Sequence, residues 1–270
     1  MFVQTSNVVS ASVLHLLTNF VIAERLGWTV KQLQGSPAHS VDSDYTELFD
    51  VNADGLPDVV SMLPGVYGGC HGLWLQGKGG AEDGFGAMEG MGVQGALGSQ
   101  LSLYNANVLS LDIDGDGTAD LVHMASQGQY VVYSPMYGPS GWLWMGRSIE
   151  PKPGLEPKLN LGADAKRTKV FDVNGDGLVD VVWGEGHNYR YLDLAGGRRP
   201  WLLKRIDGGM GKTTEISWET SVQQMLRAAR EGHPWTRTAP TVQQVVAQVT
   251  VNDNLDKYGV NRPAGKYVTK

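Results

Sequence analysis

The stretch LDIDGDGTADLV, which runs from Leu111 to Val122, has two near copies in this chain of 270 residues. FDVNADGLPDVV runs from Phe49 to Val60 and FDVNGDGLVDVV from Phe171 to Val182, so the leading aspartates stand 62 and 60 residues apart. A twelve-residue pattern that returns at a near-constant step indicates an internal repeat. A Val/Leu run follows each copy, and a step of this size suits one four-stranded propeller blade with long loops.

Each copy carries side-chain oxygens at relative positions 1, 3, 5 and 9, followed by strand-like residues. Calcium takes six to eight hard oxygen ligands, and alternate residues of a tight loop can turn inward to supply them. A glycine at position 6 permits the sharp turn that lets these oxygens converge. The sequence therefore predicts up to three Ca²⁺ sites, each a structural staple, with the candidate ligands Asp50, Asn52, Asp54, Asp58, Asp112, Asp114, Asp116, Asp120, Asp172, Asn174, Asp176 and Asp180.

The loops allow two other interpretations. An EF-hand requires a bidentate glutamate at position 12, where this chain has Ser61, His123 and Trp183. Bare Asp/Asn/Gly turns without metal are the simpler alternative, but clustered carboxylates without a cation repel one another. The pattern resembles the FG-GAP (integrin-α-like) repeat over residues 41–200. The first copy departs from it at Ala53, so we expect that loop to bind calcium more weakly.

Composition narrows the class of protein. The chain is 41% hydrophobic and 19% charged, which is typical of a folded globular protein. A net charge of −6 without a basic stripe argues against a nucleic-acid partner. The apolar stretch Val8–Ala23 is too short to span a bilayer and lacks the basic start of a signal peptide, so a packing helix is the better interpretation.

The tail after residue 200 contains DGGMGKTT, from Asp207 to Thr214, which is superficially like a phosphate-binding loop. A P-loop requires glycine at the position that Ile206 occupies, and it must open a helix. The following residues instead alternate at strand period, so we interpret the stretch as a glycine hairpin and expect no nucleotide. A short helix with a capping box at Ser221 and Gln224 follows.

The tail also carries a second resemblance. LLKRIDGGMGKTTEISWETS, then HPWTRTAPTVQQVVAQVTVND, is similar to the middle region of the B component of bacterial insecticidal toxin complexes, which is related to SpvB and Rhs proteins. Gly208 and Trp218 stand where that family usually has asparagine and tyrosine. FG-GAP repeats directly precede this region in the family, and the order is the same here.

These resemblances imply a mostly β fold: a partial propeller of FG-GAP blades, then a strand-rich, shell-like segment with one short helix. The corresponding division is an N-terminal segment (1–40), three repeats (41–200) and a truncated toxin-B-like region (201–270). They further imply a secreted, non-catalytic component that docks a translocation channel and encloses toxic cargo. The chain is short for this family, so we interpret it as a fragment.

The alternative function is a calcium-dependent adhesion or carbohydrate-binding propeller, for which Trp142, Trp144 and Trp183 are candidate sugar-facing residues. Core packing is the preferred interpretation of all three. Cys70-His71 has no second Cys/His pair to complete a metal site. His123 and His187 lack an identifiable catalytic partner, so we expect no enzyme activity.

Overall fold

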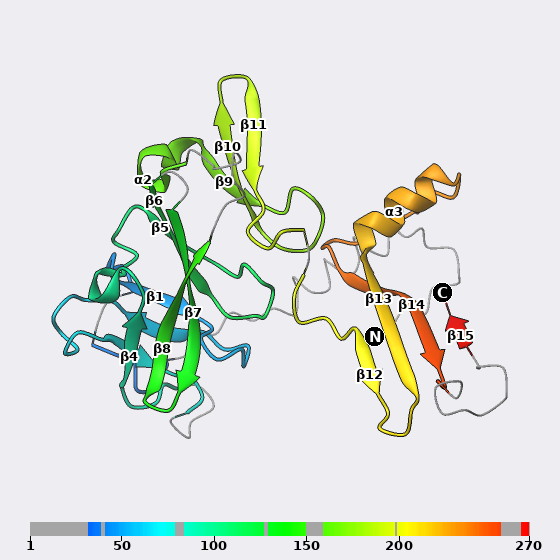
Figure 1. Ribbon diagram of the computed structural model, residues 1–270. Helices are drawn as coiled ribbons and strands as arrows, with labels where there is room; N and C mark the ends of the chain where they lie inside the picture. Colours follow the sequence, from blue (N-terminus) through cyan, green and yellow to red (C-terminus); the bar gives the residue numbers. More distant parts are fainter. Residues whose placement is uncertain are drawn as a thin grey trace, which may run out of the picture.

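The computed structural model describes residues 32–38, 41–78, 84–126, 129–149, 159–197, 199–254 and 266–269. Their fold is mostly β, as predicted, with the one short helix expected in the tail and a second one within the repeats. The strands form sheets of eight, three and four strands (Figure 1). The predicted packing helix, Val8–Ala23, lies outside the described residues.

The first two repeats supply the eight-stranded sheet and the third repeat supplies the three-stranded sheet. The strands of the first repeat are β1 (Thr46–Phe49), β2 (Asp58–Ser61), β3 (His71–Trp74) and β4 (Glu89–Gln94). Those of the second are β5 (Val108–Leu111), β6 (Asp120–Ser126), β7 (Gln129–Gly138) and β8 (Gly141–Ile149). The third has β9 (Thr168–Phe171), β10 (Asp180–Glu185) and β11 (Asn188–Leu192), preceded by helix α2 (Leu161–Asp164).

Each aspartate loop joins two antiparallel strands, as predicted from its β-branched flanks. The residue before each loop pairs with the aspartate at position 9: Phe49 with Asp58, Leu111 with Asp120, and Phe171 with Asp180. The register is therefore identical in all three repeats. The arrangement of the repeats as propeller blades stays a prediction.

The eight-stranded sheet is continuous because the last strands of the first two repeats pair with each other. Strand β4 runs parallel to β8, with Gly92 opposite Leu143 and Val93 opposite Trp144. The composition of the glycine-rich stretch 77–98, in which β4 lies, indicates a long loop, and this prediction is wrong over residues 89–94. Gly90 and Gly92 lie in a strand here, and composition alone does not distinguish such glycines from those of a loop.

Tyr133 shows why glycine is required at this junction. A Cβ atom at Gly95 or Gly146 would lie 2.6 or 2.7 Å from the Tyr133 ring, so both positions must be bare. The Tyr133 hydroxyl in turn accepts the backbone N–H of Leu97 at 3.0 Å. One buried phenol thus takes the space of two side chains and fixes the loop after β4.

Two apolar clusters hold the repeats together. One cluster belongs to the first two repeats and includes fully buried Leu73, Met91 and Trp144. The second places Val122 and Tyr130 of the second repeat against Val181 and Trp183 of the third. Burial of large apolar side chains is the main favourable contribution to folding, so these clusters make the three repeats one body.

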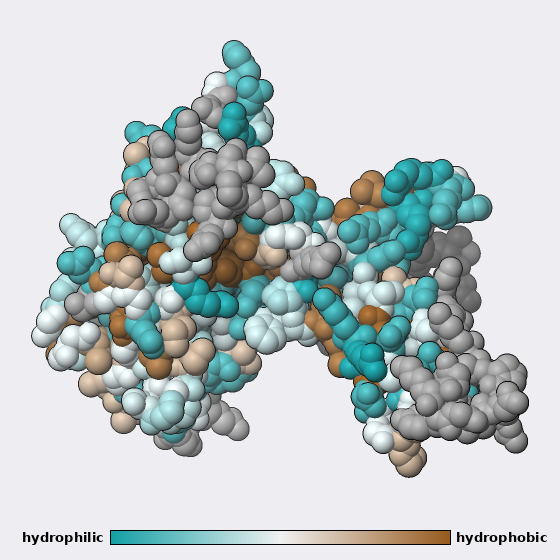
Figure 2. Space-filling model, viewed as in Figure 1, coloured by the Kyte–Doolittle hydropathy of each residue, from teal (hydrophilic) through white to brown (hydrophobic). Residues whose placement is uncertain are grey.

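The remaining residues form a second lobe. Its sheet contains β12 (Arg205–Asp207), β13 (Thr213–Thr220), β14 (Gln244–Asn252) and β15 (Lys266–Thr269), with helix α3 (Ser221–Arg230) beside it (Figure 1). Figure 2 shows a mainly hydrophilic surface over α3 and over the tip of the β10–β11 hairpin. The lobe contributes no strand to the sheets of the repeats.

The tail elements follow the sequence with two corrections. The glycine hairpin is confirmed, since the Gly208 N–H donates to the Lys212 carbonyl at 2.9 Å between β12 and β13. The capping box is formed by Thr220 and Gln223, one residue earlier than predicted. The sequence from Trp201 to Ile206 indicates a strand, but the strand begins only at Arg205. Trp201 has φ 61 and lies outside β12, because the chain turns there toward the aspartate loops.

His71 is a buried titratable group in the first cluster. Its Nδ1 accepts the indole N–H of Trp144 at 3.1 Å, and burial lowers its pKa from 6.5 to about 4. The imidazole is therefore neutral in the folded protein at physiological pH. The Cys70-His71 pair is accordingly part of the core edge, with its histidine turned inward at 2% exposure.

We predict that the wild type loses free energy of unfolding relative to a His71→Asn variant as pH decreases from about 6.5 toward 4, because the unfolded chain protonates His71 while the folded chain does not. A pKa difference of this size corresponds to roughly 3 kcal/mol. Urea unfolding of His71→Asn, which keeps an acceptor for Trp144, should show a pH profile without this loss. Parallel profiles for the two proteins would contradict the assignment.

Candidate metal centre

The aspartate at position 1 organises each loop by accepting backbone N–H groups. Asp50, Asp112 and Asp172 accept the N–H of the glycine at position 6 at 2.8, 3.1 and 2.9 Å. Those glycines have φ between 84 and 92, a left-handed conformation that residues with a Cβ atom adopt at a cost. The predicted reason for glycine at position 6 is therefore confirmed.

The side chains at positions 3 and 5 likewise accept backbone N–H groups of their own loop. The side-chain oxygen at position 3 accepts the N–H of position 5, for example from Asp116 to Asp114 at 3.2 Å. The carboxylate at position 5 accepts the N–H of position 7, for example from Thr118 to Asp116 at 2.7 Å. Successive turns of this kind point the side chains of positions 1, 3 and 5 to the inside of the loop.

The second loop brings its carboxylates closest together. Oxygens of Asp112, Asp114 and Asp116 all lie within 4.8 Å of one another, and no other acidic, histidine or cysteine group of three in the described residues does so. Calcium–oxygen distances of 2.3–2.6 Å place neighbouring ligands at such separations, so this donor set fits a Ca²⁺ ion. Further ligands would come from backbone carbonyls and water.

The first and third loops differ because they carry asparagine at position 3. Its Nδ2 donates to the carboxylate at position 5, from Asn52 to Asp54 at 2.9 Å and from Asn174 to Asp176 at 3.0 Å. These hydrogen bonds offset part of the repulsion that the second loop leaves uncompensated. An ion in the first or third loop would displace them.

The aspartates at position 9 occupy a different place from the other candidate ligands. Asp58, Asp120 and Asp180 are at most 1% exposed, and each accepts the N–H of position 2 at 2.9–3.1 Å. Burial raises the pKa of Asp58 and of Asp120 to about 6, and raises that of Asp180. These carboxylates close the base of the loop, and the second oxygen of Asp58 also accepts the backbone N–H of Gln76 at 2.9 Å.

The sequence did not single out three residues that contact the second and third loops from outside. Arg199 and Trp201 donate to Gly115 and Asp114 of the second loop, and Gln244 donates to Asp176 of the third. The only signal in the sequence was the glycine at position 4 of these two loops, where the first loop has Ala53.

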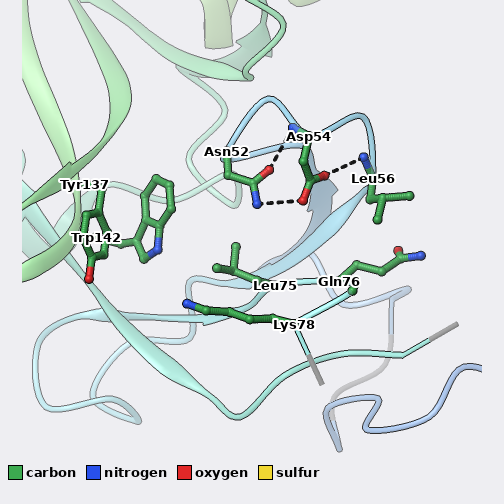
Figure 3. Close-up of a pocket in the computed structure, with 9 residues that line it drawn as sticks. Asn52, Asp54, Leu56, Leu75, Gln76, Lys78, Tyr137 and Trp142 are labelled. Carbon is green, nitrogen blue, oxygen red and sulfur yellow. Dashed lines mark hydrogen bonds between the residues drawn. The ribbon is translucent and has the colours of Figure 1, made fainter. Parts of the chain in front are cut away.

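The other candidate residues lie at varied positions. Trp144 and Trp183 are core residues at 0% and 7% exposure. Trp142 packs edge-to-face on Tyr137, with ring centroids 5.2 Å apart, and both line a cavity of about 580 Å³ beside the first loop (Figure 3). His123 lies on β6 and His187 between β10 and β11.

The fold and the loops define a mostly β protein built on three equivalent aspartate turns. Residues 158–260 match the family described as "Insecticide toxin TcdB middle/N-terminal region". No curated protein sequence matches the chain. Neither helix among the described residues has the length and apolarity needed to cross a bilayer.

Two solved structures share the fold. The chain aligns with "Crystal Structure of TcdB2-TccC3" at TM-score 0.52 and 18% identity, covering 78% of this chain and 10% of that one. It aligns with TcdB2-TccC3 without its hypervariable C-terminal region at TM-score 0.53 and 17% identity, covering 79% and 10%. The chain thus spans a tenth of the length of these structures.

We predict that Asp116→Ala and Asp176→Ala lower the melting temperature of the protein in calcium but change it much less in excess chelator. An ion at 100 times its dissociation constant stabilises by about 2.7 kcal/mol, which each variant should lose at one site. Differential scanning calorimetry with an ion count by mass spectrometry measures both effects. Asp42→Ala, an exposed aspartate outside the loops, is the control.

Asp120→Asn should stabilise the protein in excess chelator and destabilise it in calcium. With chelator at pH 7.5, the variant removes a buried negative charge that costs up to about 3 kcal/mol, so it should unfold at higher denaturant concentration than the wild type. This advantage should shrink as pH falls from 6 toward 4, because the folded wild type then protonates Asp120. In calcium the variant should be the less stable protein, and a stabilised variant in both conditions would exclude Asp120 as a ligand.

Proposed function

We propose that this chain is a non-catalytic structural segment of a bacterial toxin complex, similar to the B component. The observation that carries the proposal is that the family match and the fold similarity together cover both the tail and the repeats. The family match covers β9 to β14, while the fold similarity to TcdB2-TccC3 extends over 78% of the chain, so it must include much of the repeats. The sequence predicts the same order, in which the repeats precede the toxin-B-like middle region.

In this proposal the repeats dock a translocation channel, and the strand-rich tail forms part of a shell around toxic cargo. The continuous eight-stranded sheet supports a mechanical role, because its hydrogen-bonded ladder joins two repeats into one rigid element. The protein would act outside the cell that makes it, together with the other subunits of the complex.

Calcium is part of the same proposal. The residues that would hold it are those of positions 1, 3, 5 and 9 in each loop, and the second loop offers the most charge. Bound there, the ion would supply the positive charge that the converging carboxylates lack. The loop side chains otherwise make hydrogen bonds to the loop backbone, which supports a structural role and not a catalytic one.

One observation favours the alternative of a calcium-dependent carbohydrate-binding protein. The Trp142–Tyr137 pair, with Tyr137 66% exposed, lines the cavity next to Asn52 and Asp54 of the first loop (Figure 3). Aromatic faces beside polar groups are a common way to bind small polar ligands. The cavity therefore identifies where a sugar would bind if this second function held.

The two functions are distinguished by one pair of binding measurements in calcium. The purified chain should bind an isolated toxin-complex translocation channel in biolayer interferometry, and Trp142→Ala should leave that binding within about twofold. On a glycan array the wild type should give no signal above background. A glycan signal abolished by Trp142→Ala, without channel binding, would replace the toxin-complex proposal with the alternative.

A further inference from the structure

Arg199 lies between the second and third aspartate loops and contacts both. Its Nη2 donates to the carbonyl of Gly115 at 2.9 Å, and its Nη1 donates to the carbonyl of Gly177 at 3.5 Å. Gln244, which is the first residue of β14, donates from its Nε2 to the carbonyl of Asp176 at 2.6 Å. The second lobe and the chain segment leading to it are therefore attached to the repeats at the outer surface of these loops.

The accepting carbonyls are oriented by the loop carboxylates. The Gly115 carbonyl shares its peptide unit with the Asp116 N–H, which donates to Asp114. The Asp176 carbonyl shares its unit with the Gly177 N–H, which donates to Asp172, and the Gly177 carbonyl belongs to the unit whose N–H donates to Asp176. Each of these peptide units points its N–H to the loop interior and its carbonyl to Arg199 or Gln244.

This arrangement couples the inside of the loop to its outside. A planar peptide unit cannot turn its N–H without turning its carbonyl by the same angle. An ion that fixes the carboxylates therefore also fixes the acceptors of the second lobe. If the carboxylates separate because they repel one another, the acceptors lose their common direction.

The glycines at position 4 of the second and third loops lie where the second lobe and the segment leading to it contact the repeats. A Cβ atom at Gly115 would lie 2.8 Å from the Arg199 guanidinium, and one at Gly175 would lie 3.0 Å from Val222 of α3. The first loop has Ala53 at the same position, with φ 58 compared with 72 and 73 in the other two loops. The loop conformation itself thus accepts alanine, and glycine is needed only where the lobe approaches.

Hydrogen bonds matter at this junction because apolar packing there is incomplete. A cavity of about 360 Å³ lies beside Asp176, Arg199, Trp218 and Gln244. Trp201 reaches the second loop from a left-handed backbone conformation, φ 61, and its indole N–H donates to Asp114 Oδ2 at 3.1 Å. A non-glycine residue in that conformation is uncommon, so contacts at the loop must hold it there.

We propose that calcium in the second and third loops governs the docking of the second lobe, with Arg199 as the positioning residue that links them. The inference rests on the proposed calcium sites. It adds that the ions set the position of the second lobe relative to the repeats. By linkage, docking must in turn strengthen calcium binding by the same factor.

The test measures the distance between the two parts in the full chain. Spin labels at Tyr189→Cys and Leu226→Cys, in a Cys70→Ser background, report it by double electron–electron resonance. Both labelled side chains are more than half exposed. We expect one narrow distance distribution in calcium and a broad one in chelator. Arg199→Gln should broaden the distribution in calcium and weaken calcium binding about tenfold, within the range of coupling that linked sites show.

Two alanine–glycine exchanges form a matched pair. Gly115→Ala should broaden the distribution, whereas Ala53→Gly, at the equivalent position of the first loop, should leave it unchanged. In the Arg199→Gln background, Gly115→Ala should add no further broadening, because the side chain that it displaces is gone. Equal effects of Gly115→Ala and Ala53→Gly would overturn the docking role of position 4.

The failure of this inference differs from the failure of the proposed function. If calcium binds and raises the melting temperature but the distribution stays narrow in chelator, docking is independent of the ion and the inference alone fails. If no ion binds at all, the calcium assignment fails and the inference with it. An Arg199→Gln protein with unchanged calcium affinity and unchanged distances would also overturn it.

Discussion

The carboxylate at position 9 stands where each aspartate loop meets its second strand, and the surrounding structure depends on it. Asp58, Asp120 and Asp180 pair in the strand ladder and also accept the N–H of position 2, so they join the loop to the sheet. Burying a carboxylate is costly unless a cation or several hydrogen bonds compensate it. This one constraint accounts for the hydrogen bond that each of the three carboxylates keeps to position 2 of its loop and for the common register of the repeats.

The sequence was informative wherever a local pattern decides the structure. The repeat predicted three strand–loop–strand units, and the alternation after Thr213 predicted the hairpin that replaced the apparent P-loop. It failed where distant backbones meet. Strand β4 was hidden in a glycine-rich run, and one glycine of that run, Gly95, leaves space for Tyr133, which lies about 40 residues further along the chain.

For the candidate metal site, too, the sequence predicted the local features and missed a distant contact. The convergence of Asp112, Asp114 and Asp116 was foreseen from spacing alone, since alternate residues of a tight loop turn inward. The role of Arg199 was not, because an arginine 84 residues away from Gly115 leaves no local trace. What the sequence did contain was the Ala53/Gly115 difference, which reflects the neighbour of the loop as well as its conformation.

The parallel pairing of β4 with β8 has a consequence for the synthesis of the chain. Strand β4 is complete at Gln94, but its partner residue Met145 emerges 51 residues later. At 5–20 residues per second the ribosome leaves that edge without its partner for roughly 3–10 s. An open edge invites pairing with other nascent chains, and glycine is a poor strand former. Gly90 and Gly92 thus lower the strand propensity of this edge during the interval before β8 is made.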